Sequence, residues 1–367
     1  MAFTLTVARV LGCPDALPGP ATVVIDSGEI RAVTPAEAAA AVEPWTLVPG
    51  FVDLQVNGIG DVDVATADGP DWARLDAHLL GAGVTSWCPT LVTAPLDVYP
   101  ARLERVAAAA VRPEEGQPLI VGAHLEGPML GGRPGAHPPA HLQPVDLAWL
   151  DSLPPVVRLV TIAPELDGVI DAIGLLRSRG IVVSLGHSAA EASQVTAAVD
   201  AGATMVTHLY NGMEPLHHRR PGLVGVGLTD ERLAVGLIAD LVHVDPTALA
   251  LAFRAKGPGR VVLVSDAVAW QAERIGRTEI RHDGTAPRLP DGTLAGSSLT
   301  MDAAIRNIVA SGAASLEAAV AAASTSPAAV LGLDDRGLVA PGRRADLVAL
   351  DGDLEVVATW VGGVRRP

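Results

Sequence analysis

The sequence predicts a (β/α)₈ barrel with a small β-sandwich domain built from both ends of the chain. Three observations carry this prediction. A long middle segment alternates strand-like and helix-like runs, both ends are rich in short β-like runs, and reactive residues follow the ends of the strand-like runs. The chain has 367 residues, of which 49% are apolar, so one large core and one minor domain can both be built.

Both ends of the chain consist of short strand-like runs separated by turns. Runs cover residues 4–10 and 21–25 near the start, and 346–350 and 355–361 near the end. Asp26-Ser27-Gly28 is typical of a turn. We therefore expect residues 1–48 and 336–367 to form the β-sandwich and residues 49–335 to form the barrel.

The middle of the chain holds eight candidate strands and several candidate helices. The strands are expected at 47–54, 84–87, 119–124, 157–162, 181–185, 205–208, 234–239 and 260–264. Helices are expected at 72–80, 99–110, 169–178, 191–199 and 247–255, where apolar residues recur at helical spacing. An open doubly wound sheet is the competing fold. It would more often carry a GxGxxG loop after its first strand, and residues 55–60 do not match that pattern.

Charge and composition exclude several classes of partner. The formal net charge of −15 disfavours nucleic acids and anionic membranes. The most apolar stretch, 233–244, is interrupted by Asp240 and His243, so it is too short to span a membrane. The start lacks the pattern of a signal peptide. A cytoplasmic location, with neither nucleic acid nor membrane as partner, is therefore expected.

Four reactive residues follow the ends of strand-like runs. Glu126 comes just after the third run, His187 after the fifth, His208 at the end of the sixth and Asp266 just after the eighth. The carboxyl ends of barrel strands meet at one rim, where barrel active sites form. Each residue alone has an ordinary explanation, such as a hydrogen-bonded histidine or a helix-capping acid. Their joint placement indicates a common site.

Glu126, His187 and His208 together predict a site for one divalent metal ion. Two imidazoles and a carboxylate form a three-ligand shell that suits zinc and leaves a position open for water. Iron, cobalt or cadmium would fit the same shell. Such an ion makes water more acidic and polarises a carbonyl group. Asp266 is placed to take the proton and return it to the leaving group, a pattern typical of amide hydrolysis.

Two amides in the first barrel strand favour one metal ion over two. Gln55 and Asn57 stand where many binuclear hydrolases of this architecture have histidines. Amides are poor zinc ligands. These two side chains can equally well hydrogen-bond within the barrel mouth.

A basic run, His217-His218-Arg219-Arg220, comes soon after His208 in an otherwise acidic chain. His218 and Arg219 could hold a phosphate through charge-assisted hydrogen bonds. A solvated surface loop is the alternative explanation for such a run.

From about Val48 to the end, the chain carries an ordered series of short motifs. They are PGFVDLQVNG (49–58), HLEGP (124–128), GAHP (135–138), TIAPE (161–165), GHS (186–188), THLYNGM (207–213), HHRRPG (217–222), IADLVHV (238–244), VSDA (264–267), LAGSSLTM (294–301) and GRRADLVAL (342–350). This series resembles the N-acetylglucosamine-6-phosphate deacetylase family of the amidohydrolase superfamily.

The resemblance implies a role for each matching residue. Glu126, His187 and His208 would bind the metal, and Asp266 would act as general base and then as general acid. His137 would contact the acetamide or polarise its carbonyl, which makes it both catalytic and substrate-binding. The sugar phosphate would be contacted by Asn211, Gly212, His243 and Arg219, the last of these often across a dimer interface. The partners implied are an amino-sugar phosphate and a second copy of the chain.

The sequence departs from the family after Asp266, where residues 267–274 read AVAWQAER. A bulky Trp270 close to Asp266 is expected to reshape the sugar pocket. This leaves open another N-acetyl sugar as substrate, such as N-acetylgalactosamine 6-phosphate or an unphosphorylated sugar. A catalytically silent barrel with a binding role is a third hypothesis, which the presence of all three ligands and Asp266 disfavours.

Overall fold

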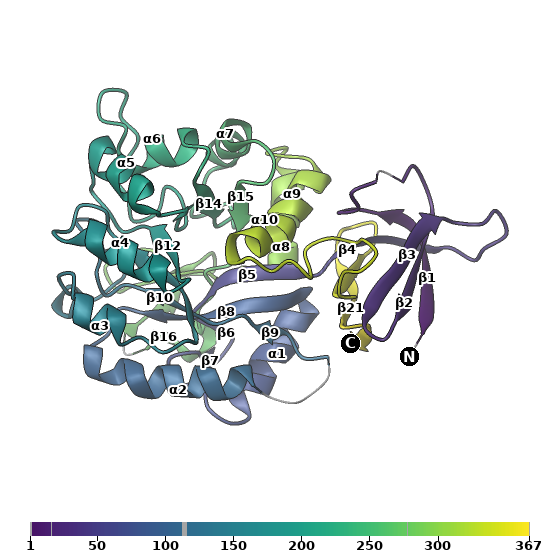
Figure 1. Ribbon diagram of the computed structural model, residues 1–367, viewed down its shortest axis with the longest axis horizontal. Coiled ribbons are helices and arrows are strands. Elements are labelled where there is room, and N and C mark those ends of the chain that lie inside the picture. The colour runs from purple at the N-terminus through teal and green to yellow at the C-terminus, as the bar shows by residue number, and fades with distance from the viewer. Residues whose placement is uncertain (1, 16, 112–115, 277, 367) are drawn as a thin grey trace.

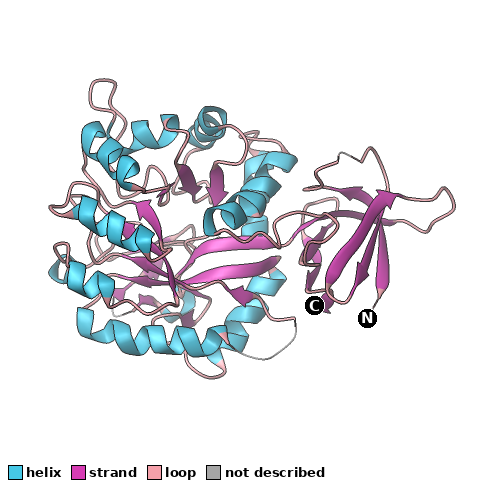
Figure 2. Cartoon of the chain, viewed as in Figure 1, coloured by secondary structure: helices cyan, strands magenta, loops and turns pink. Residues whose placement is uncertain are grey.

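The computed structural model describes residues 2–15, 17–111, 116–276 and 278–366. Eight parallel strands form the barrel, and helices lie outside them, as Figures 1 and 2 show. In spatial order the strands are β5 (Phe51–Val56), β8 (Val84–Val92), β10 (Ala123–Glu126), β11 (Val157–Ile162), β12 (Val182–Leu185), β13 (Met205–Val206), β14 (Ala234–Leu237) and β15 (Val261–Leu263). The predicted barrel is confirmed.

The barrel is closed by the chain segments that follow its first and last strands. Val56, at the end of β5, forms a parallel bridge with Ala267, beyond β15. The Asp266 amide donates to the Gln55 carbonyl at 2.9 Å, and the Asn57 amide donates to the Ala267 carbonyl at 2.8 Å. Closure therefore places Asp266 directly beside the first strand.

Helices cover the strands because their apolar faces pack against the barrel core. They are α1 (Asp71–Gly81), α2 (Tyr99–Ala110), α3 (Leu147–Asp151), α4 (Val169–Ser178), α5 (Ala192–Ala201), α6 (Gly222–Thr229), α7 (Pro246–Lys256), α8 (Met301–Ala310), α9 (Leu316–Ala323) and α10 (Thr325–Leu331). In α2, Tyr99, Leu103 and Val106 are buried on one face at helical spacing. The predicted helix 99–110 has the observed bounds.

The two chain ends together form a seven-stranded sheet, seen on the right of Figure 1. Its strands are β22 (Val364–Arg366), β21 (Val356–Val361), β20 (Leu347–Leu350), β4 (Glu43–Pro49), β1 (Phe3–Val10), β2 (Ala21–Asp26) and β3 (Glu29–Pro35). Ile25 and Val7 from one half share a core with Leu347 and Trp360 from the other. The expected joint domain of both ends is therefore present, and we keep 48/49 and 335/336 as its proposed boundaries.

Two predicted strands are each divided in the structure. The single strand expected at 47–54 is wrong, because β4 pairs with β20 of the terminal sheet whereas β5 pairs with β8 of the barrel. The division falls at Gly50, where a Cβ atom would lie 2.2 Å from Thr85 Oγ1. The run 119–124 likewise divides into β9 (Leu119–Ile120) and β10, with Gly122 at a φ of +149° between them.

A flap of two short hairpins lies between β15 and α8, and sequence periodicity did not predict it. It contains β16 (Arg274–Ile275) paired with β17 (Thr278–Glu279), and β18 (Arg281–His282) paired with β19 (Pro287–Arg288). These strands are too short to show a period in the sequence. In the described part of the chain, no helix has the length and apolar character needed to cross a membrane.

Candidate active site

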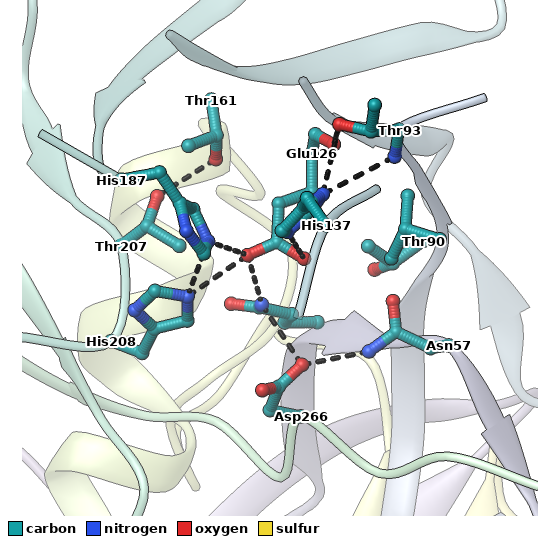
Figure 3. A network of polar contacts seen from close by, with 12 residues as sticks. Asn57, Thr90, Thr93, Glu126, His137, Thr161, His187, Thr207, His208 and Asp266 are labelled. Atoms are coloured by element: carbon teal, nitrogen blue, oxygen red, sulfur yellow. Dashed lines mark hydrogen bonds and ion pairs between the residues drawn. The ribbon is translucent and has the colours of Figure 1, made fainter. Parts of the chain in front are cut away.

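The four residues predicted to share one rim do converge there. Glu126 is the last residue of β10, His187 and His208 follow β12 and β13, and Asp266 follows β15. Figure 3 shows their side chains pointing toward one another. All four are at least nine-tenths buried.

Three donor atoms meet within hydrogen-bonding distance of one another. His187 Nε2 lies 3.1 Å from Glu126 Oε1, and His208 Nε2 lies 2.9 Å from the same oxygen. The two Nε2 atoms are 3.1 Å apart. Two ring nitrogens and one carboxylate oxygen therefore face a single point.

His137 lies near the other oxygen of the same carboxylate. Its Nε2 lies 3.7 Å from Glu126 Oε2, and potential ligand atoms of Glu126, His137 and His187 lie within 4.8 Å of one another. Its Nδ1 is 3.4 Å from the backbone N–H of Thr93, which donates to it, and 2.8 Å from Thr93 Oγ1. Where Nδ1 accepts the hydrogen bond from the Thr93 N–H, the neutral ring carries its proton on Nε2 and can donate it to a ligand.

The amides of Gln55 and Asn57 hold the two carboxylates in place. Gln55 Nε2 donates to Glu126 Oε1 at 2.9 Å and to Asp266 Oδ1 at 3.0 Å. Asn57 Nδ2 donates to the same Asp266 oxygen at 2.7 Å. Hydrogen bonding within the barrel mouth, one of the two readings of these residues, is confirmed.

The backbone is strained at three of the four residues. His187, His208 and Asp266 have φ values of +50°, +26° and +50°, in the region that favours glycine. Such conformations persist where the surroundings enforce them, and they cluster at functional sites. The strain therefore agrees with the convergence of the side chains.

Burial and neighbouring charges shift the pKa values at this rim. Burial and the charge of Glu126 raise the pKa of Asp266 to about 7. Burial would raise the pKa of Glu126, but hydrogen bonds from His187 and His208 hold it well below its usual value. Burial lowers the pKa of His137 to about 3, so that this ring is neutral at pH 7.

A cavity of about 400 Å³ opens above the cluster, a size suited to a small molecule. Asn211, Gly212 and His243 line it together with His137 and Asp266. A Cβ at Gly212 would lie 2.8 Å from His187 Nδ1, so glycine allows the loop to approach that ring. His243 Nδ1 lies 2.6 Å from Asp240 Oδ2, a contact that orients the ring.

The basic run lies elsewhere in this chain. Neither His218 nor Arg219 is among the described residues that line the cavity, and both are exposed. Arg219 instead borders a separate hollow near the start of α5, with Glu191 and Arg220. The phosphate-binding role of His218 and Arg219 therefore stays a prediction that requires a partner subunit.

Trp270 is not among the described residues that line the cavity, and its effect on the sugar pocket stays a prediction. It packs with Val268 and Ile280 in a small core beneath the flap, and its ring lies 5.0 Å from that of His282. Ile275 and Thr278 of the flap line the cavity.

The motif pattern of the Amidohydrolase family matches residues 46–366. The chain belongs to the amidohydrolase family. It is 42% identical to an N-acetylgalactosamine-6-phosphate deacetylase of Escherichia coli O157:H7 over 86% of each chain. It is also 42% identical to the human N-acetylglucosamine-6-phosphate deacetylase, over 86% of this chain and 82% of the human one.

Solved structures resemble this amidohydrolase along its whole length. The N-acetylglucosamine-6-phosphate deacetylase of Mycobacterium smegmatis superposes with a TM-score of 0.92 at 34% identity, covering 100% of both chains. The corresponding enzyme of Thermotoga maritima gives a TM-score of 0.91 at 31% identity, covering 99% of both. A variant of the M. smegmatis enzyme has been solved with N-acetyl-D-glucosamine-6-phosphate bound.

The residues of this rim fit a divalent metal ion. The Nε2 atoms of His187 and His208 are 3.1 Å apart, and they cannot each donate a hydrogen bond to the other. Both nevertheless face the same buried oxygen of Glu126. A cation at their common point would satisfy all three lone pairs. This amidohydrolase thus has a Glu-His-His donor set of the kind that borderline ions prefer.

Zinc affinity is expected to rise by tenfold or more between pH 6 and pH 8. The raised pKa values of Asp266 and His208 leave protons in the metal-free pocket below about pH 7, and a bound cation must expel them. Titration against a chelator at several pH values measures this. Asp266→Asn should flatten the slope, and an affinity independent of pH in the wild type would contradict the expectation.

Sequence reasoning missed three contributors to the site. Thr93 contacts Nδ1 of His137, Asp240 orients His243, and the flap supplies one wall of the cavity. Asp240 stands inside the IADLVHV motif, which was a signal for it. Thr93 and the flap lie outside every motif, and only the tertiary structure brings them to the rim.

Proposed function

We propose that this amidohydrolase hydrolyses the acetamide of N-acetylglucosamine 6-phosphate to glucosamine 6-phosphate and acetate. The observation that carries the proposal is the meeting of Glu126, His187 and His208 beside Asp266, at the base of a sugar-sized cavity. Relatives with 42% identity that act on two such 6-phosphates support the choice of substrate class.

Glu126, His187 and His208 would hold one divalent ion, with zinc favoured and iron, cobalt or cadmium as alternatives. When bound, the ion supplies Lewis acidity, which polarises a carbonyl group and makes water more acidic. Gln55 keeps the Glu126 carboxylate aimed at the two rings.

Asp266 would carry the proton through the reaction. A water oxygen attacks the acetyl carbon while the Asp266 carboxylate takes one of its protons. Asp266 then returns this proton to the sugar nitrogen as the C–N bond breaks. The products are the free amine and acetate.

His137 would bind the acetamide oxygen. Its ring is neutral at pH 7, and Thr93 occupies its Nδ1, so that Nε2 would be the atom that donates to this oxygen. A donor placed there stabilises the negative charge that develops on the carbonyl oxygen during attack.

Asn211, Gly212 and His243 would contact the sugar and its phosphate. Asp240 fixes His243 Nδ1, so that Nε2 remains for the ligand. If Arg219 and His218 also contribute, they must come from a second subunit, and a homodimer is therefore part of the proposal. We place the protein in the cytoplasm, in keeping with its expected phosphorylated substrate.

Acetate release from four sugars tests the substrate. Zinc-loaded protein is expected to act on N-acetylglucosamine 6-phosphate with a kcat/KM at least tenfold above those for N-acetylgalactosamine 6-phosphate and both unphosphorylated sugars. Preference for the galactosamine compound would select the alternative that the E. coli relative suggests. No acetate from any of them, with one zinc ion bound, would reject the proposed function.

A further inference from the structure

Glu165 lies at the barrel rim between the two chain segments that carry His137 and His187. It follows β11, whose neighbours in the sheet are β10 and β12. The loop after β10, residues 127–138, carries His137, and the segment after β12, residues 186–191, carries His187. Glu165 ends the TIAPE motif, and none of the steps proposed above uses its half-buried side chain. Its contacts indicate a separate task.

The two oxygens of Glu165 bind both segments at once. Oε1 accepts from the Gly132 backbone N–H at 3.0 Å and from the Ala189 backbone N–H at 2.8 Å. Oε2 accepts from the Ser188 hydroxyl at 2.7 Å. One carboxylate thus ties the loop after β10 to the segment after β12.

Two glycines let the loop after β10 approach this carboxylate. A Cβ atom at Gly131 would overlap Glu165 Oε1, and a Cβ atom at Gly132 would lie 2.9 Å from the Cβ of Ala189. That spacing is closer than non-bonded carbon atoms normally come. Without side chains at these positions, the loop backbone comes within hydrogen-bonding distance of Glu165.

The loop that Glu165 binds also holds the imidazole of His187. The Gly131 N–H donates to the His187 carbonyl at 2.9 Å. His187 Nδ1 lies 3.2 Å from the Arg133 carbonyl, which can only accept, so the ring donates from Nδ1. A neutral ring then keeps the lone pair of Nε2 for a cation beside Glu126 Oε1, which is the usual arrangement of a metal-binding histidine.

We propose that Glu165 is a positioning residue, which fixes His187 for the metal ion and His137 for the substrate through the two segments that it joins. This inference rests on the proposed function, because it takes His187 as a metal ligand and His137 as the donor to the acetamide. Geometry carries it, since three donors from two segments require two acceptor atoms at the end of a glutamate-length side chain. A displacement of about 1 Å in a positioned group can cost on the order of 100-fold in rate.

Three substitutions at Glu165 test this inference. Glu165→Ala is expected to lower kcat and zinc affinity roughly 10- to 100-fold each, the usual cost of losing a group that orients a metal ligand. Glu165→Gln should stay within about threefold of wild type, because its oxygen can accept both backbone N–H groups while its amide donates to Ser188 Oγ. Glu165→Asp should resemble Glu165→Ala, since its shorter side chain cannot reach both segments.

The readouts are zinc affinity, measured against a chelator, and steady-state acetate release from N-acetylglucosamine 6-phosphate. Thermal unfolding of the metal-free protein reports separately on the fold. Glu191→Ala is the matched control, because Glu191 stands at the N-cap of α5 close to Ser188 and borders the separate hollow near Arg219. Loss of an N-cap lowers stability by about 1 kcal/mol at most sites, so Tm should fall while kcat and zinc affinity stay within about twofold of wild type.

Two outcomes would overturn the inference. Wild-type kcat and zinc affinity in Glu165→Ala, with only Tm reduced, would mean that Glu165 merely stabilises the rim. Equal losses in Glu165→Gln and Glu165→Ala would mean that the shared hydrogen bonds do not carry the effect.

The zinc measurement separates this inference from the proposed function. If the wild-type protein binds one zinc ion but releases no acetate, the proposed function fails. A loss of zinc affinity of about tenfold or more in Glu165→Ala, restored in Glu165→Gln, would still support the positioning role. An unchanged zinc affinity in Glu165→Ala would reject it.

Discussion

Asp266→Asn is expected to lower kcat by about 10²- to 10⁴-fold, the range that general acid–base catalysis contributes. The asparagine keeps an oxygen that can accept from Gln55 and Asn57, which now donate to Asp266 Oδ1 at 3.0 and 2.7 Å. The fold and the cavity should therefore persist, and KM should change little. What disappears is the carboxylate that exchanges the proton.

Steady-state kinetics with zinc-loaded protein measures this loss. Asp302→Asn is the control, because Asp302 is also buried but lies on α8, paired with Arg306 and away from the cavity. We expect its kcat to stay within about twofold of wild type. An Asp266→Asn protein that retains a tenth or more of wild-type kcat would show that another group moves the proton.

Removal of the metal ion is expected to abolish activity and to lower stability. Glu126→Gln or His208→Ala should reduce bound zinc from one equivalent to a small fraction at micromolar zinc, because each loses one of three donor groups that meet within 3.1 Å. A ligand at a thousandfold excess over its Kd stabilises the folded state by about 4 kcal/mol. Chelation of the wild type should therefore lower its Tm, and zinc should restore it.

Metal analysis measures the loss of bound zinc, and thermal unfolding measures the change in Tm, both independently of activity. His141→Ala serves as the control, since His141 lies in the short helix η2 (Pro139–His141), outside the cavity lining. It should bind one zinc ion and show the same zinc-dependent rise in Tm as wild type. Full zinc occupancy in both Glu126→Gln and His208→Ala would rule out this ligand set, and His137 would then be the residue to test, because it faces the same carboxylate.

Local patterning determined much of the fold. The apolar spacing of residues 99–110 predicted α2 with its observed bounds, and the run 157–162 predicted β11. The helix buries one face against the core, and the strand is buried along its length. The spacing of apolar residues within each short segment therefore already predicts which side chains are buried. The rim of Glu126, His187, His208 and Asp266 followed from the same alternation, because parallel barrel strands all end on one side.

Contacts between residues far apart in the sequence decided the parts of the fold and of the site that local patterning did not predict. The run 47–54 is apolar apart from Asp53, and only pairing with β20 on one side and β8 on the other divides it between two sheets. The positive φ values of His187, His208 and Asp266 depend on the loops packed around them. The pKa of Asp266 depends on its burial and on Glu126, a residue 140 positions away.

The positions of Arg219 and Arg288 illustrate the difference most directly. A cluster of basic residues after His208 is visible in the sequence, but in this chain Arg219 borders a different hollow. Arg288 stands alone in the sequence, and the turn at Asp283 and the closure of the barrel bring it to the cavity wall. The sequence determined which side chains are available and which strand ends they follow. The tertiary structure decided which of them share a cavity, because that depends on chain closure over more than a hundred residues.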